Sequence, residues 1–268
     1  MNPVSAEIRE LDGLEDLRAL SDLLAAVWGR GGESVGPDLL KALAHSGSYI
    51  AGAYQDGRLI GGLVGWLGGH PRRELHLHSH ILGVLPGSDA RGIGFELKQH
   101  QRRWCLDREV RVMEWTTDPL VRRNAYFNLT KLGARAPDYL VNFYGAMADD
   151  LNAGEESDRL LVRWQLDSPE AQRAATGQAV EPDVEHLRER GSAAILSVGA
   201  SGEPVVEPST ARVLLCQVPE DVVALRASDP SLAHDWRVAL RGAMTRSLGS
   251  GYAIKGATRS GWYVLEKQ

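Results

Sequence analysis

Residues 75–104 read LHLHSHILGVLPGSDARGIGFELKQHQRRW and predict a strand, a turn and a helix in that order. The run rich in Leu, Ile and Val stops at Pro86, and apolar residues such as Ile93 and Leu97 then recur at helical spacing. Gly92 lies directly before this helix. Because the first amides of a helix have no partner inside it, this N-terminus predicts a site for a phosphate group.

Three phosphate-binding patterns can be compared with this stretch. The Rossmann fingerprint G-x-G-x-x-G lacks its third glycine, since Leu97 stands there, and the Gly-Lys-Ser/Thr ending of a P-loop is absent. The pattern V-x-P-x-x-R/Q-x-x-G-x-G/A fits better, with Val84, Pro86, Gly92 and Gly94 in place. The stretch therefore resembles motif A of the GNAT acyltransferases, whose turn holds the pyrophosphate of acetyl-CoA. An ordinary connection that binds nothing is the alternative.

A second segment, NAYFNLTKLGA at 124–134, is similar to the GNAT pattern N-x-x-A-x-x-F-Y-x-K-L-G-F. The matching residues are Ala125, Lys131, Leu132 and Gly133. Many members of the family place there a Tyr that protonates the leaving thiolate, and this position is Leu129 here. The wording EWTTDPLVRRNA at 114–125 resembles a poorly characterised GNAT branch with a C-terminal extension.

The resemblance implies that acetyl-CoA is the cosubstrate and that an amine, whose identity the sequence does not report, attacks the thioester directly. It implies backbone contacts of one strand segment with the pantetheine chain, and amide contacts of the glycine turn with the pyrophosphate. The cofactor-binding residues so implied are Leu82, Gly83, Val84, Gly87, Arg91, Gly92, Ile93, Gly94 and Asn124. The family's Arg or Gln position is Asp89, a carboxylate that repels a pyrophosphate unless it points away.

Three residues are candidates for moving the amine's proton. Glu114 shares a strand face with apolar neighbours, where burial is expected to raise the pKa of a carboxyl group toward that of a general base. His80 titrates near neutrality, and Tyr126 is the phenol nearest to Leu129. Asp118 is as well explained as a helix cap, and each candidate also has a purely structural explanation.

His76, His78 and His80 alternate along the predicted strand, so their imidazoles share one face. Such a row can present metal ligands, which makes a metal-dependent hydrolase one alternative function. A polar wall, or one histidine that contacts substrate, is the favoured interpretation, with no metal. A non-catalytic module that binds or senses acyl-CoA is the other alternative, because of Asp89 and Leu129.

The pattern of the whole chain predicts an α/β protein with a GNAT-like mixed central sheet flanked by helices, and a smaller α+β extension. We expect an acyltransferase domain over 1–166 and an extension of unassigned role over 167–268, which can either dock on the first domain or form a homodimer contact. The sequence further predicts a single helix over Leu120–Leu132, strands over Tyr139–Tyr144 and Arg159–Leu166, a loop over Gly68–Arg73, and a linker or loose helix after Asp167.

Composition limits the kind of protein. The 268 residues carry 43% hydrophobic and 24% charged side chains with a formal charge of −5, which is typical of a globular protein and argues against nucleic acid as a partner. Neither a signal peptide nor an apolar run long enough to span a membrane is visible. Cys105 and Cys216 form no redox or metal motif, so we expect a cytoplasmic setting.

Overall fold

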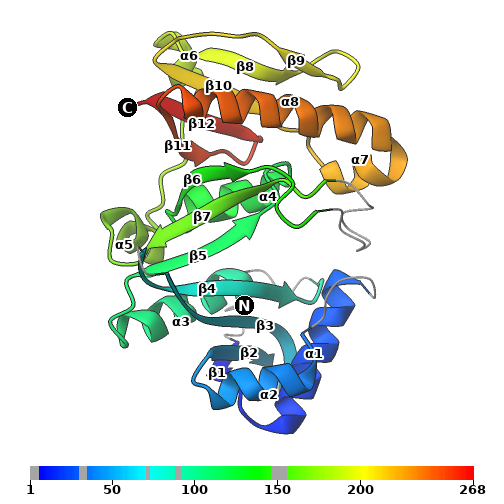
Figure 1. Ribbon diagram of the computed structural model, residues 1–268, viewed down its shortest axis with the longest axis vertical. Helices are drawn as coiled ribbons and strands as arrows, with labels where there is room; N and C mark the ends of the chain where they lie inside the picture. The colour runs from blue at the N-terminus through cyan, green and yellow to red at the C-terminus, as the bar shows by residue number, and fades with distance from the viewer. Residues whose placement is uncertain (1–5, 30–34, 71–72, 88–91, 146–155) are drawn as a thin grey trace. The chain divides into compact units, whose positions relative to one another are not determined.

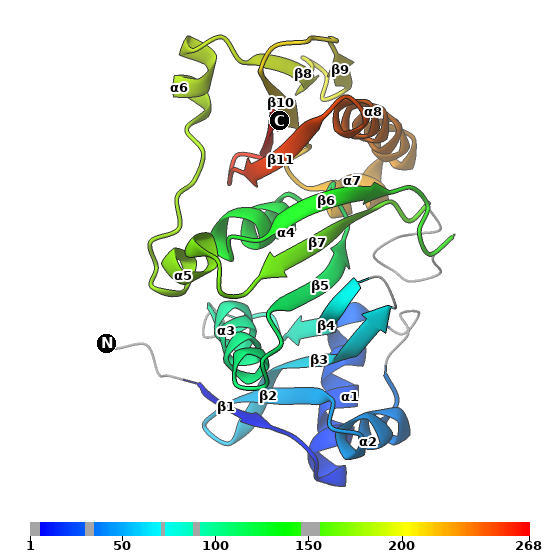
Figure 2. The same ribbon diagram turned by 60° about the vertical axis from the view of Figure 1, so that its left-hand side comes forward.

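The computed structural model describes residues 6–29, 35–70, 73–87, 92–145 and 156–268. The chain forms two compact units (Figures 1 and 2). The first contains the described residues up to Trp115 together with Gln165–Asp167, and the second contains the rest. No helix within the described ranges combines the length and the apolar character that crossing a membrane requires.

The first unit is built on a mixed sheet in the order β1-β2-β3-β4-β5. Strands β1 to β4 pair with one another in antiparallel fashion, whereas β5 is parallel to β4. Helices α1 and α2 cover one face of the sheet and α3 covers the other (Figure 2). Leu17, Leu20 and Leu24 of α1 pack on Ile50 and Val64 because their helical spacing puts them on one stripe. The elements are β1 (Glu7–Glu10), α1 (Leu14–Trp28), α2 (Pro37–His45), β2 (Tyr49–Gln55), β3 (Arg58–His70), β4 (Arg73–Val84), α3 (Ile93–Leu106) and β5 (Val112–Thr117).

The second unit contains strands in the order β7-β6-β11-β12-β10-β8-β9, antiparallel except for β8 and β10. Helix α8 lies across one face of its sheet, with Trp236, Leu240 and Met244 fully buried (Figure 1). The elements are α4 (Arg122–Ala125), the π-helix η2 (Tyr126–Lys131), β6 (Arg135–Leu140), β7 (Arg159–Gln165), α5 (Pro169–Ala175), α6 (Val184–Glu189), β8 (Ala193–Val198), β9 (Pro204–Val206), β10 (Val213–Gln217), α7 (Val222–Ser228), α8 (Pro230–Gly249), β11 (Tyr252–Ala257) and β12 (Trp262–Lys267).

Several predicted elements are wrong in detail. The helix expected over Leu120–Leu132 begins only at Arg122 and continues from Tyr126 as a π-helix. The strand expected over Tyr139–Tyr144 lies earlier, because pairing with β7 ends at Leu140. The predicted loop over Gly68–Arg73 is mostly strand, since β3 reaches His70. The stretch after Asp167 holds the two capped helices α5 and α6.

Candidate active site

The central strand β4 separates from its parallel neighbour halfway along its length. In the described part of the chain, β4 pairs with β5 only through Leu77–Met113 and His78–Glu114. Its pairing with β3 continues to Val84. Within the described ranges, the segment Leu82–Val84 of β4 therefore pairs with no residue of β5, and its edge on that side suits an extended ligand.

A β-bulge lies at the point of separation. Val64 pairs with Ile81 and Gly65 with Ser79, so His80 is an additional residue on β4. The bulge changes the face on which alternate side chains lie. Ser79 contacts residues of α3, whereas Ile81, two residues on, packs with the α1 side of the sheet. The segment Leu82–Val84, singled out from the sequence, follows this bulge directly.

Helix α3 begins close to the end of β4. Its first residue follows Gly92. Gly92 has φ of 92°, a conformation that favours glycine, and beyond its chain neighbours no atom of the described residues lies close to the position that a Cβ atom would occupy. The amides of Phe95 and Glu96 bond to the Gly92 carbonyl, while those of Ile93 and Gly94 precede the first such bond. The start of helix α3 thus offers backbone donors to an anion. Asp89 and Arg91 lie outside the described residues.

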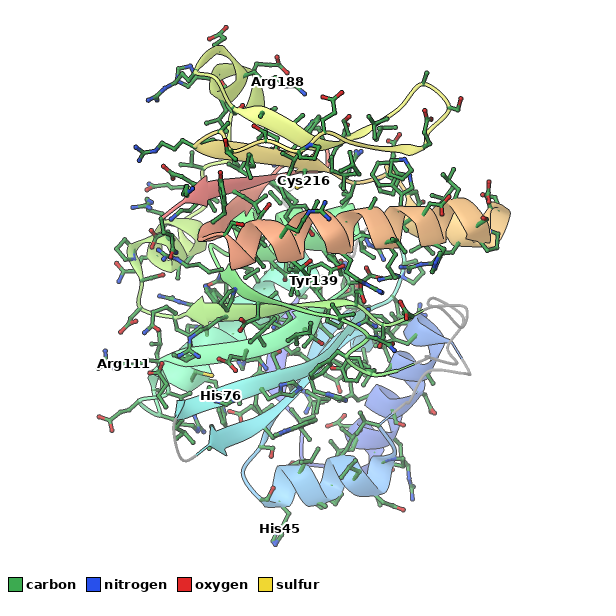
Figure 3. All side chains as sticks on the ribbon, turned by 45° about the horizontal axis from the view of Figure 1, so that its top comes forward. His45, His76, Arg111, Tyr139, Arg188 and Cys216 are labelled. Carbon is green, nitrogen blue, oxygen red and sulfur yellow. The ribbon has the colours of Figure 1, made fainter. Side chains whose placement is uncertain are left out.

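Glu114 and the histidines of β4 form a polar cluster on the other face of the strand from Ser79. Nε2 of His76 lies 3.7 Å from Oε2 of Glu114, which is buried, and Figure 3 shows His76 on β4. The rings of His78 and His80 lie 5.1 and 4.6 Å from the Trp66 ring. Burial, and then the neighbouring histidines, lower the pKa of His78 to about 4, so this ring is neutral at pH 7. His80 itself is exposed.

The histidine row does not form a metal-ligand group. Within the ranges that the structure describes, no cluster of three or more His, Cys, Asp or Glu is arranged to hold a metal ion. The pairing of His76 with Glu114 is the feature that sequence reasoning missed. It depends on the register of β4 against β5, and the sequence offered no signal for it beyond placing each residue on a predicted strand.

A buried lysine lies under the same strand. Nζ of Lys98, on α3, donates to Oγ of Ser79 at 2.7 Å and lies 3.8 Å from the centre of the Trp115 ring. Oγ of Ser79 donates in turn to the side-chain oxygen of Gln101 at 2.9 Å. Burial lowers the pKa of Lys98 to about 7. The sequence placed Lys98 in a helix but gave no reason to expect a buried ammonium group.

Asn124 and Tyr126 belong to the second unit and are described with it. Both are half-buried, and the Tyr126 hydroxyl accepts a hydrogen bond of 2.8 Å from Nη2 of the exposed Arg259. Leu129 is 5% exposed and lies in the core of the unit, as its position on the apolar stripe predicts. No phenol is therefore present at the Leu129 position.

Asp118 does not cap the helix that follows it. One of its oxygens accepts a hydrogen bond from the amide of Leu120. The other accepts hydrogen bonds from Nη2 of Arg226 at 2.6 Å and from Nη2 of Arg237 at 3.2 Å. Nη1 of Arg159 lies 3.7 Å from the same oxygen. Burial raises the pKa of Asp118, but the arginine charges outweigh it and hold that pKa below its usual range. The carboxylate is therefore the centre of a buried ionic cluster, and two of its three arginines, Arg226 and Arg237, belong to the predicted extension.

Residues 17–133 match the sequence model described as the Acetyltransferase (GNAT) family. This part of the chain is therefore similar to the GNAT acetyltransferases. The predicted GNAT-like fold of a mixed sheet flanked by helices is confirmed, and so is the predicted class of enzyme. No curated protein matches the chain.

Solved structures of acetyltransferases are similar to the chain. Naa20 of Chaetomium thermophilum, in complex with a bisubstrate analogue, is 17% identical, with 66% of this chain and 93% of that chain covered and a TM-score of 0.49. An N-acetyltransferase from Staphylococcus aureus Mu50 is 14% identical, with 60% and 99% covered and a TM-score of 0.48. The putative acetyltransferase yncA from Salmonella typhimurium, with its cofactor acetyl-CoA, is 15% identical, with 66% and 98% covered and a TM-score of 0.47.

Proposed function

We propose that this protein transfers the acetyl group of acetyl-CoA to an amine by direct attack, in a cytoplasmic setting. The observation that carries the proposal is the separation of β4 from β5 after His78, next to the glycine-initiated helix α3 of a GNAT domain. An open strand edge suits the amide groups of a pantetheine chain, and the first amides of a helix suit a pyrophosphate. The acetyltransferase domain extends over 1–166 in this proposal, and residues 167–268 are its extension.

The cofactor is held mainly by backbone. Leu82, Gly83 and Val84 supply the strand edge, and the N–H groups of the turn and the start of α3 receive the phosphates, with Gly87, Arg91, Gly92, Ile93 and Gly94 in that role. Asn124 hydrogen-bonds the pantetheine. In the reaction the amine nitrogen forms a bond to the thioester carbon, the C–S bond breaks, and the amine loses a proton.

Glu114 is the group we assign to accept that proton, with His80 as the alternative and Tyr126 as the acid for the thiolate. The Glu114 assignment rests on its burial and on the imidazole of His76 3.7 Å away, which can pass a proton onward to solvent. Glu114→Gln keeps the shape and removes the base, so kcat should fall about 100-fold, with KM for acetyl-CoA unchanged. Glu15→Gln, on the exposed side of α1, is the control.

Calorimetry with acetyl-CoA tests the cofactor site. Gly92→Asp and Gly92→Asn differ by a charge, and both residue types tolerate positive φ. We expect micromolar binding by the wild type, and binding by the Asp variant at least about tenfold weaker than by the Asn variant, because a carboxylate there repels the pyrophosphate. Gly47→Asp, with φ of 81° and open space, is the matched control and should bind normally. Absence of binding to the wild type, or equal affinities of the two Gly92 variants, would contradict the proposal.

One observation favours a second function, acyl-CoA binding without turnover. Leu129 is buried where many GNAT members place the acid for the leaving thiolate, so that step lacks its usual group. This function predicts the same binding to acetyl-CoA but no release of free thiol with any member of a broad amine panel. Thiol release that Glu114→Gln suppresses would exclude it.

A further inference from the structure

The second unit contains a cavity of about 330 Å³ between the C-terminal half of α8 and the strands that this helix covers. None of the residues assigned to acyl transfer lines it. In Figure 2, α8 lies against β8, β9 and β11, and it contacts each of them. The apolar lining of the cavity comes from the buried side chains of Ile195, Leu214 and Ala243 and from the exposed Val206, with the ring of Tyr252 beside them. This lining suits a hydrocarbon or aromatic body.

The rim of the cavity carries positive charge. Arg246, from the last turn of α8, and Lys267, from β12, both line the space, and the described lining contains no Asp or Glu. Neither cation forms an ion pair with another described residue, although Nζ of Lys267 lies 5.5 Å from the centre of the Tyr252 ring. Four hydroxyl groups complete the rim: Ser209, Thr210, Ser247 and Ser250.

We propose that this cavity binds a small organic anion, a single carboxylate on a short apolar body. The C-terminal end of α8 faces the same space. A helix C-terminus carries a partial negative charge of about half an elementary charge, which disfavours a bound anion. Two full positive charges outweigh that effect. A volume near the lower end of ligand sites limits the apolar body to a few carbons or one ring. The hydroxyl groups supply donors for the carboxylate oxygens that the cations leave unbonded.

Ligand-observed NMR on the full chain, without acetyl-CoA, tests the proposal independently of acetyl transfer. The probes are propionate, hexanoate and 3-phenylpropionate, each paired with its neutral amide of the same shape. We expect at least one carboxylate to bind with a Kd of about 1 mM or tighter, and its amide to bind at least about tenfold more weakly. The double variant Arg246→Gln/Lys267→Gln should bind the carboxylate more weakly than the wild type by the same factor.

The controls separate the site from general surface charge. Arg188→Gln/Arg212→Gln removes two cations of the same unit that do not line the cavity, and it should leave binding unchanged. Ser250→Trp fills the mouth from an exposed position and should abolish binding, with the fold checked by circular dichroism. The proposal is overturned if no probe binds at about 10 mM, if amides bind as tightly as acids, or if the Arg246/Lys267 variant binds like the wild type.

Discussion

Each unit of the chain buries an ionisable side chain, Lys98 in the first unit and Asp118 in the second, and the two have different kinds of partner. In the first unit, Lys98 has the neutral partners Ser79 and Gln101 and the face of the Trp115 ring. In the second unit, Asp118 is surrounded by Arg159, Arg226 and Arg237. Burial acts against the charged form in both places. It lowers the pKa of Lys98 to about 7, whereas the pKa of Asp118 is held below its usual range.

The difference shows what decides the state of a buried charge. The hydrogen bonds that Lys98 donates to neutral groups, together with the contact with a ring face, offset too little of the desolvation cost, so its ammonium group gives up its proton near neutrality. Opposite charges within hydrogen-bonding distance do offset it. Asp118 is thus a fixed structural anion, while Lys98 changes charge over the pH range in which an enzyme works.

Asp118→Asn should have the largest effect. Asparagine keeps the volume and the acceptor for Leu120, but it leaves Arg226 and Arg237 without their buried counter-charge. We expect a loss of about 3–5 kcal/mol in the free energy of unfolding, measured by urea denaturation. Asp138→Asn, on an exposed position of β6, should change it by less than about 0.5 kcal/mol. A loss at Asp118 no greater than that at Asp138 would show that the cluster contributes nothing.

Lys98→Met should give a smaller, pH-dependent effect. The unfolded chain keeps the proton on this lysine up to its ordinary pKa of about 10.5, whereas the folded chain releases it above about 7. Between these values the unfolded state binds more protons, so the unfolding free energy of the wild type rises with pH. The variant lacks this dependence. From pH 7 to pH 9 the wild type should therefore gain about 2–3 kcal/mol relative to the variant.

The measurement is denaturation at a series of pH values, with Lys41→Met as the control. Lys41 is exposed in the same unit, and its variant should follow the wild type at every pH. Parallel profiles of wild type and Lys98→Met would mean that Lys98 keeps one charge state throughout. That result would remove the contrast with Asp118.

Trp115→Leu should have the smallest effect, and it sharpens the comparison. The ring face 3.8 Å from Nζ favours the charged ammonium group, so its removal should lower the pKa of Lys98 further. We expect a decrease of about 0.5–1 unit, the equivalent of about 1 kcal/mol, followed by NMR titration of the lysine side chain. An unchanged or higher pKa would assign the shift to burial alone.

Much of the first unit was predictable because its elements are local. The strand before Gly92 and the helix after it follow from short-range spacing, and the resemblance to the GNAT family was found in the same stretch. The bulge at His80 and the contact of His76 with Glu114 were not predictable, since both depend on how strands align.

The same limit applies to the second unit. Asp118 was read as a helix cap because its neighbours in sequence, Pro119 and Leu120, suggest one. Its true partners Arg226 and Arg237 lie more than a hundred positions away in the chain. Buried ionic clusters of this kind leave no periodic trace in a sequence, because each member is a single residue in a different element. The short helix α7, which carries Arg226, was not predicted either.

Hydrogen–deuterium exchange with and without acetyl-CoA is the decisive experiment for the proposed cofactor site, because that site consists mainly of backbone amides. The account predicts slower exchange in Leu82–Val84 and at Ile93 and Gly94 when the cofactor is present, and unchanged exchange along α8 and β10. Protection that is absent from both segments, or confined to the second unit, would contradict the assignment of the cofactor site.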